Sequence, residues 1–173
     1  MSLPADDEFE LLAHIDVMDR LVERAAPPAQ LRDALLDSLS PAPTFLGYAK
    51  RVARVFDLDV ARVQEALLAM SDRSQWVDVQ GGGKFFPLTG GPRVQGAQMG
   101  FVEFRAGSLF PRHRHQGLEV QFVITGRLIE TDGREFLPGD LLVKESGTEH
   151  EFSIGAESSC VCAVVLYEGI DFV

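Results

Sequence analysis

The distribution of glycine divides this sequence into two parts with different folding patterns. Of its 16 glycines only Gly47 precedes residue 74, and all the others follow that residue. Glycine weakens helices and is common at the turns between strands. Before residue 74 the apolar residues recur at helical spacing, whereas after it short β-rich runs alternate with glycine turns. We therefore expect a helical segment over residues 1–73 and an all-β domain over residues 74–173.

The helical segment is expected to contain four short amphipathic helices. In the first of them an apolar stripe is formed by Leu11, Ile15, Met18 and Val22. Proline pairs and an aspartate N-cap separate the helices. A core made by roughly 65 residues is thin, so we expect this segment to dock on another domain or to form a homodimer. The four helices are expected at residues 6–25, residues 27–39, residues 45–56, and from an N-cap at Asp57 or Asp59 to residue 70.

The all-β domain is expected to be a sandwich or barrel of many short strands. Alternation over residues 118–125 places Glu119, Gln121 and Val123 on one face of a strand and mostly apolar side chains on the other. If the Glu119 face lines the interior, the opposite face also needs cover, unless a β-bulge changes the alternation. Candidate interior residues are Gln121, Phe101, Phe104 and Phe110. The strand-like runs lie at residues 76–80, 84–88, 98–106, 118–125, 127–130, 141–144, 149–154 and 160–167.

Charge and hydropathy exclude several classes of partner. The chain has 26 acidic and 16 basic residues, a net charge of −10 and a pI near 4.8. A protein that binds nucleic acid through a broad basic face is therefore not expected, nor is one that binds an anionic membrane surface. The longest apolar run, residues 160–167, is far shorter than a membrane-spanning helix. Residues 1–10 carry four acidic and no basic side chains, unlike a signal peptide, so we expect a soluble, cytoplasmic protein.

Three of the four histidines form a pattern that suits a metal ion. His113 and His115 are two residues apart, so on an extended segment both imidazoles leave the same face. Glu119 follows at the start of the next strand, and His150 comes after a Pro-Gly-Asp turn. Imidazole suits zinc, copper, iron and nickel, and a carboxylate neutralises part of the charge of a divalent ion. The alternative is a basic loop on an acidic protein, which the regular spacing disfavours.

These residues resemble the two motifs of the cupin superfamily. The first motif is met in full by Gly107, His113, His115, Glu119 and Gly126. The second is met by Gly139, Gly147 and His150, while Glu145 stands in place of its proline and Ile154 in place of its asparagine. The resemblance covers roughly residues 75–170. It implies a jelly-roll-like, double-stranded β-helix barrel with a metal ion inside.

A closer resemblance is to the cupin half of ChrR-like anti-sigma factors. It rests on residues 110–119, the Pro-Gly-Asp turn, residues 148–150 and residues 169–172. In that family a helical domain sequesters a sigma factor and a zinc-bearing cupin takes part in a stress response. The resemblance implies zinc at His113, His115, Glu119 and His150, with iron, manganese and nickel as the alternatives. The family's helical domain also has a zinc site with a Cys-x-x-Cys pair, but this chain has no cysteine before Cys160.

Three functional hypotheses follow, and they differ in what the metal does. In the first, a zinc-dependent regulator of transcription acts through protein contact, with no catalytic residue. In the second, the same four residues bind Fe(II) in a small dioxygenase with an organic substrate. A structural metal in an interaction module is the third. Cys160 and Cys162, on one face of a strand, are expected to be buried thiols rather than a redox pair.

Overall fold

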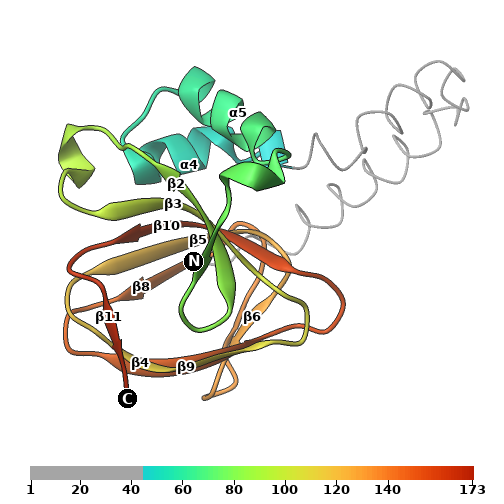
Figure 1. The fold of residues 1–173 in the computed structure, drawn as a ribbon, viewed down its shortest axis with the longest axis vertical. Coiled ribbons are helices and arrows are strands. Elements are labelled where there is room, and N and C mark those ends of the chain that lie inside the picture. The colour runs from blue at the N-terminus through green and yellow to red at the C-terminus, as the bar shows by residue number, and fades with distance from the viewer. Residues whose placement is uncertain (1–44) are drawn as a thin grey trace, which may run out of the picture. The chain divides into compact units, whose positions relative to one another are not determined.

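The computed structural model describes residues 45–173, which belong to one compact unit (Figure 1). Two α-helices lie in this part of the chain, α4 (Ala49–Phe56) and α5 (Val60–Ala69), with the short 3-10 helices η1 (Arg73–Gln75) and η2 (Pro92–Val94). They agree with the third and fourth expected helices. The first two expected helices, at residues 6–25 and 27–39, lie outside the described residues.

The rest of the described chain forms two antiparallel sheets. One sheet has the strand order β1-β2-β3-β10-β5-β8, and the other has the order β11-β4-β9-β6-β7. The sheets face each other without joining into one closed barrel, so the expected barrel is an open two-sheet, cupin-like fold. The strands are β1 (Val77–Val79), β2 (Gly83–Leu88), β3 (Gln98–Phe104), β4 (Leu109–His115), β5 (Glu119–Thr125), β6 (Leu128–Glu130), β7 (Glu135–Phe136), β8 (Leu141–Lys144), β9 (Glu149–Ile154), β10 (Cys160–Leu166) and β11 (Ile170–Phe172).

The two helices cover the outer face of the six-stranded sheet (Figure 1). α4 buries Val52 and Phe56 completely, and the Phe56 ring lies 5.5 Å from that of Phe101 on β3. On β5, Phe122 and Ile124 belong to the same apolar cluster as the helices. The apolar face of residues 118–125 thus receives its cover from α4 and α5, whose own apolar stripes would otherwise face water.

A second apolar cluster fills the space between the sheets. It includes Phe104, Phe110, Val123 and Phe152, which all point inward. Phe101 belongs instead to the helix-covered cluster, so its expected place in the interior was wrong. Residues 101 and 104 are an odd number apart on one strand, and their side chains therefore leave opposite faces of the sheet.

A turn held by one aspartate joins α4 to α5. Asp57 adopts a left-handed conformation with φ 53°, and its side chain accepts hydrogen bonds from the backbone N–H (2.9 Å) and Nε (2.7 Å) of Arg93. Gly91 packs so closely here that a Cβ atom would lie 1.9 Å from the Asp57 carbonyl oxygen. These contacts tie the helices to the connection between β2 and β3.

Candidate metal centre

A β-bulge in β4 places an aromatic side chain and two histidines on the same inner face. Phe110 pairs with Phe152 and His113 pairs with His150, so β4 has one residue more than β9 over this stretch. The extra residue shifts the alternation, and Phe110, His113 and His115 are all buried. β4 was not among the expected strand runs, because charged residues and a proline interrupt its apolar pattern.

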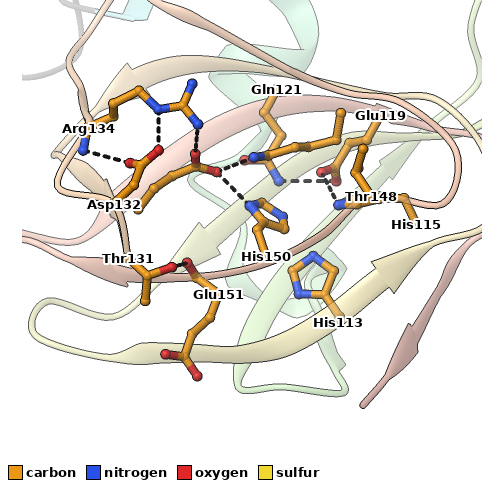
Figure 2. Close-up of polar contacts among 12 residues, drawn as sticks. His113, His115, Glu119, Gln121, Thr131, Asp132, Arg134, Thr148, His150 and Glu151 are labelled. Carbon is orange, nitrogen blue, oxygen red and sulfur yellow. Dashed lines mark hydrogen bonds and ion pairs between the residues drawn. The ribbon is translucent and has the colours of Figure 1, made fainter.

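The three histidines converge in the space between the sheets (Figure 2). One nitrogen from each of His113, His115 and His150 lies within 4.8 Å of the other two. The ring centroids of His113 and His150 are 4.4 Å apart. The side chains are 2%, 0% and 7% exposed, respectively. The fold therefore assembles the three imidazoles that the spacing of the sequence selects.

Glu119 approaches this cluster from the opposite sheet. Its Oε2 lies 3.8 Å from His115 Nε2, and Gln121 Nε2 donates a hydrogen bond to its Oε1 at 3.1 Å. The compact trio of nitrogens does not include the Glu119 carboxylate, which lies beside it. The structure thus brings three of the expected ligands together and places the fourth next to them.

Several buried polar atoms here have no hydrogen-bond partner. They are both ring nitrogens of His115, Nε2 of His150, Oε2 of Glu119 and Oε1 of Gln121. An unpaired buried polar atom costs about 1–3 kcal/mol, and such atoms are rare in native proteins. Nitrogen and carboxylate lone pairs that face one another without a hydrogen atom between them fit a bound cation.

Burial sets the protonation of these groups. It lowers the pKa of His115 and of His150 to about 4, and it lowers the pKa of His113 as well. The imidazoles are therefore neutral at neutral pH, with lone pairs available. Burial also raises the pKa of Glu119 to about 7, and it outweighs the Gln121 hydrogen bond and the charge of Lys144, which both lower it.

Hydrogen bonds fix which nitrogen of two histidines faces the site. His113 Nδ1 donates to the carbonyl oxygen of Pro111 at 2.9 Å, since a carbonyl only accepts. His150 Nδ1 lies 2.7 Å from Oε1 of Glu130 and donates to it. In both rings Nε2 is left without a proton, and Nε2 is the atom that a metal would bind.

Glu130, which the sequence analysis missed, organises a buried ionic network behind His150. The side chain is 4% exposed, and it accepts hydrogen bonds or ion pairs from His150, from Lys144 Nζ (2.5 Å) and from Arg134 Nη2 (2.7 Å). Burial alone would raise the pKa of Glu130, but hydrogen bonds from Lys144 and His150 outweigh it and the pKa is lowered. The sequence did contain a signal for this residue. Glu130 is two residues after Leu128 on β6, so alternation along the strand places its carboxylate on the same inward face.

A cavity of about 300 Å³ opens beside the histidines, between the sheets. His113, Glu119 and Gln121 line one part of it, and its other walls are mostly phenylalanine and aliphatic side chains. Phe104 and Phe110, expected in the interior, lie in these walls. Val79 and Gln80, at the β1–β2 turn, border the cavity as well.

The two cysteines lie on β10 in the interior, as expected. Cys160 and Cys162 are free and fully buried, with their sulfur atoms 3.7 Å apart. The contact with Cys160, together with burial, raises the pKa of the Cys162 thiol. The Cys162 thiol is therefore protonated at neutral pH, a state in which a thiol reacts slowly.

Comparisons with solved structures find partial likenesses of low identity. One is to the complex of Rhodobacter sphaeroides SigE with the anti-sigma ChrR: 24% identity, covering 53% of this chain and 48% of that chain, with a TM-score of 0.47. Another is to an acetylacetone dioxygenase from Acinetobacter johnsonii: 19% identity, covering 58% of this chain and 72% of that chain, with a TM-score of 0.47.

A sequence relative is the DddL protein of Cereibacter sphaeroides, named as a candidate dimethylsulfoniopropionate lyase. It is 32% identical over 66 residues, which are 38% of this chain and 28% of that protein. This chain therefore spans well under half of the relative it matches.

None of the helices within residues 45–173 is long and apolar enough to cross a lipid bilayer.

The family comparison covers more of the chain. The family described as the ChrR cupin-like domain matches residues 64–168, which include the second half of α5, the strands from β1 to β10 and all three histidines of the cluster. That is more than half of the 173 residues. With its two facing sheets and buried histidines, this chain belongs to the ChrR cupin-like domain family.

Proposed function

We propose that His113, His115, His150 and Glu119 bind one divalent metal ion and that this ion is zinc. The observation that carries the proposal is the set of buried, unpartnered nitrogen and oxygen atoms that face one another. Three neutral imidazoles and one carboxylate form a donor set that zinc accepts in a four-coordinate site. A bound ion would supply Lewis acidity at the inner end of the cavity.

The positions of the four side chains indicate what such an ion would do for the fold. The three histidines of the site come from β4 and β9 of one sheet, whereas Glu119 comes from β5 of the other. An ion bound by all four would therefore join the two sheets. Loss of one ligand would weaken that connection between the sheets. A chemical signal that removes a ligand would therefore change the structure as far as the outer surface of the molecule.

We further propose that the protein is a zinc-dependent regulator of transcription in a stress response, and that it acts in the cytoplasm by contact with a sigma factor. Support comes from membership of a family named for ChrR and from the amphipathic pattern expected in residues 6–39. No direct contact with nucleic acid or membrane is proposed, because the chain is strongly acidic. A homodimer remains our expectation, to be measured by sedimentation equilibrium.

Three measurements on the full chain, purified without added metal, test the proposed metal and role. Elemental analysis is expected to find one zinc per chain, and an oxygen electrode is expected to find no oxygen uptake with small diketones or thiols. Size-exclusion chromatography is expected to show a stable complex with a sigma factor from the same genome. A chain that retains no divalent metal would contradict the site. A zinc-loaded chain that binds none of the genome's sigma factors would contradict the partner.

The cavity beside the histidines favours one alternative, a small Fe(II)-dependent dioxygenase. The cavity, with a volume of about 300 Å³, has room for an organic substrate next to the ion. Under this alternative the purified chain holds iron, and oxygen uptake depends on a substrate. Metal content and oxygen uptake therefore separate the regulator from the dioxygenase.

A further inference from the structure

The side chains that line the cavity indicate what kind of molecule fits in it. Phe85, Phe104, Phe110 and Phe172 lie in them, together with valine, leucine and isoleucine side chains. Such walls favour an apolar molecule, and aromatic rings in particular, whose edges and faces pack against phenylalanine. The volume of about 300 Å³ corresponds to about ten water molecules at liquid density, and so to a ligand of about ten non-hydrogen atoms.

Charge restricts the polar end of that ligand. Among the residues that line the cavity, all of them in the described part of the chain, none is a lysine or arginine. The nearby Lys144 is engaged with Glu130. The donor set carries one negative charge, so a bound divalent ion leaves a net charge of +1 in an apolar setting. One anionic group is therefore favoured there, while a second anion would meet no cationic side chain in the lining and an ammonium group would be repelled by the net positive charge.

Gln121 adds a second polar requirement. Its side chain is 4% exposed and lines the cavity. The Glu119 carboxylate accepts a hydrogen bond from Nε2, which leaves Oε1 as a buried acceptor with no partner. A ligand that fills the cavity and expels water must supply a donor to this oxygen, or the unpaired acceptor costs about 1–3 kcal/mol.

We propose that the cavity binds a small aryl 2-hydroxy acid. Its carboxylate binds the metal as a fifth ligand, since zinc can expand from four to five ligands. Its ring packs among the phenylalanines, and its hydroxyl group donates to Gln121 Oε1. The inference rests on the proposed metal site and gives the ligand class of that site, either as the signal of a regulator or as the substrate of an enzyme.

Calorimetric titration of the zinc-loaded full chain tests the proposal, with mandelate as the probe and phenylacetate as its match without the hydroxyl group. We expect mandelate to bind about tenfold more tightly than phenylacetate, which corresponds to about 1.4 kcal/mol. Benzylmalonate, with two carboxylates, and phenethylamine are expected to bind more weakly than either. Chelator-treated protein is expected to lose mandelate binding.

Two variants with the same chemical change locate the effect. Gln121→Leu is expected to bind mandelate and phenylacetate equally, whereas Gln64→Leu, at an exposed position of α5, keeps the tenfold difference. Zinc is measured on each sample. Stoichiometric zinc without mandelate binding, or equal binding of the two acids by the unmodified chain, overturns this inference alone. A chain without zinc overturns the proposed metal site and this inference with it.

Discussion

Glu130 on β6 accepts a hydrogen bond from His150 Nδ1 on the adjacent strand β9, with 2.7 Å between nitrogen and oxygen. The contact holds the His150 ring so that Nε2 points toward the other two histidines. Glu130 also neutralises Lys144, whose side chain is 12% exposed. One carboxylate therefore both orients a proposed metal ligand and compensates a buried cation.

Substitution of Glu130 is expected to weaken metal binding although Glu130 touches no metal. Glu130→Ala should lower zinc affinity about 10–100-fold, because His150 loses the group that orients it. The same change leaves Lys144 without a partner and should destabilise the fold by about 3–5 kcal/mol. Competition titration with a zinc indicator measures the affinity, and urea unfolding measures the stability.

Glu130→Gln separates orientation from charge. The amide oxygen still accepts from His150 Nδ1, so zinc affinity should fall less than in Glu130→Ala. The matched control is Glu145→Gln, at an exposed position. If both Glu130 variants bound zinc as the control does, the positioning role would be wrong.

Metal removal is expected to lower thermal stability through the connection between the sheets. At free zinc about 100 times Kd, binding stabilises the folded state by about 2.7 kcal/mol, or roughly 5–10 °C in the unfolding midpoint. His113→Ala and His150→Ala should each lose most bound metal and show little further change with a chelator. Differential scanning calorimetry with and without chelator makes the measurement, and stoichiometric metal in both variants would refute the site.

The β1–β2 turn offers a substitution with its own control. A Cβ atom on Gly81 would lie 2.5 Å from the ring of Phe110 and 3.0 Å from that of Phe172. Gly82 has nearly the same φ, 97° against 93°, but a Cβ atom there would have nothing within 4 Å. Gly81→Ala should therefore be about 1–3 kcal/mol less stable than Gly82→Ala in urea unfolding, since the backbone strain is common to both. Equal stabilities would show that the turn does not pack on this aromatic wall.

Asp57 predicts a dependence of stability on pH. Hydrogen bonds from the backbone and then the side chain of Arg93 lower its pKa below the ordinary 3.8. A group with a lowered folded pKa stabilises the fold above its unfolded pKa, and this contribution disappears as pH falls through the folded value. Asp57→Asn should thus be less stable than the unmodified chain at pH 7, with a difference that shrinks below about pH 4. Asp59→Asn, at a helix start without a side-chain cap, is the control. A difference that does not change with pH would contradict the assignment.

The sequence predicted the histidine cluster better than its surroundings. Spacing along extended segments places His113, His115 and Glu119 within two neighbouring stretches of chain, and the structure brings His150 to them. Alternation over residues 118–125 also predicted that an apolar face needs cover, and α4 provides it. These features depend on local geometry, which a sequence expresses directly.

The remaining features depend on how distant strands pair. The contact of Glu130 with His150 arises from the pairing of β6 with β9, and its contact with Lys144 crosses to β8 of the other sheet. No local pattern determines either contact. The bulge in β4 is a mismatch between two strands and is visible only when both are in place. Phe101 was misplaced for a simpler reason, since apolar character does not distinguish the two buried faces of β3.

The burial of β5 on both faces has a consequence for the order in which the molecule opens. Its inner side chains, Glu119 and Gln121, lie beside the histidine cluster, and its outer ones, Phe122 and Ile124, lie under the helices. Within its sheet the strand is bonded on one side to β10 and on the other to β8. Its amide hydrogens should exchange with solvent only when the whole unit unfolds, whereas those of the edge strands β1 and β11 exchange through local fraying. We thus expect the carboxylate of Glu119 to lie in the part of the fold that opens last, while residues of β1 and β11, which open first, line the same cavity.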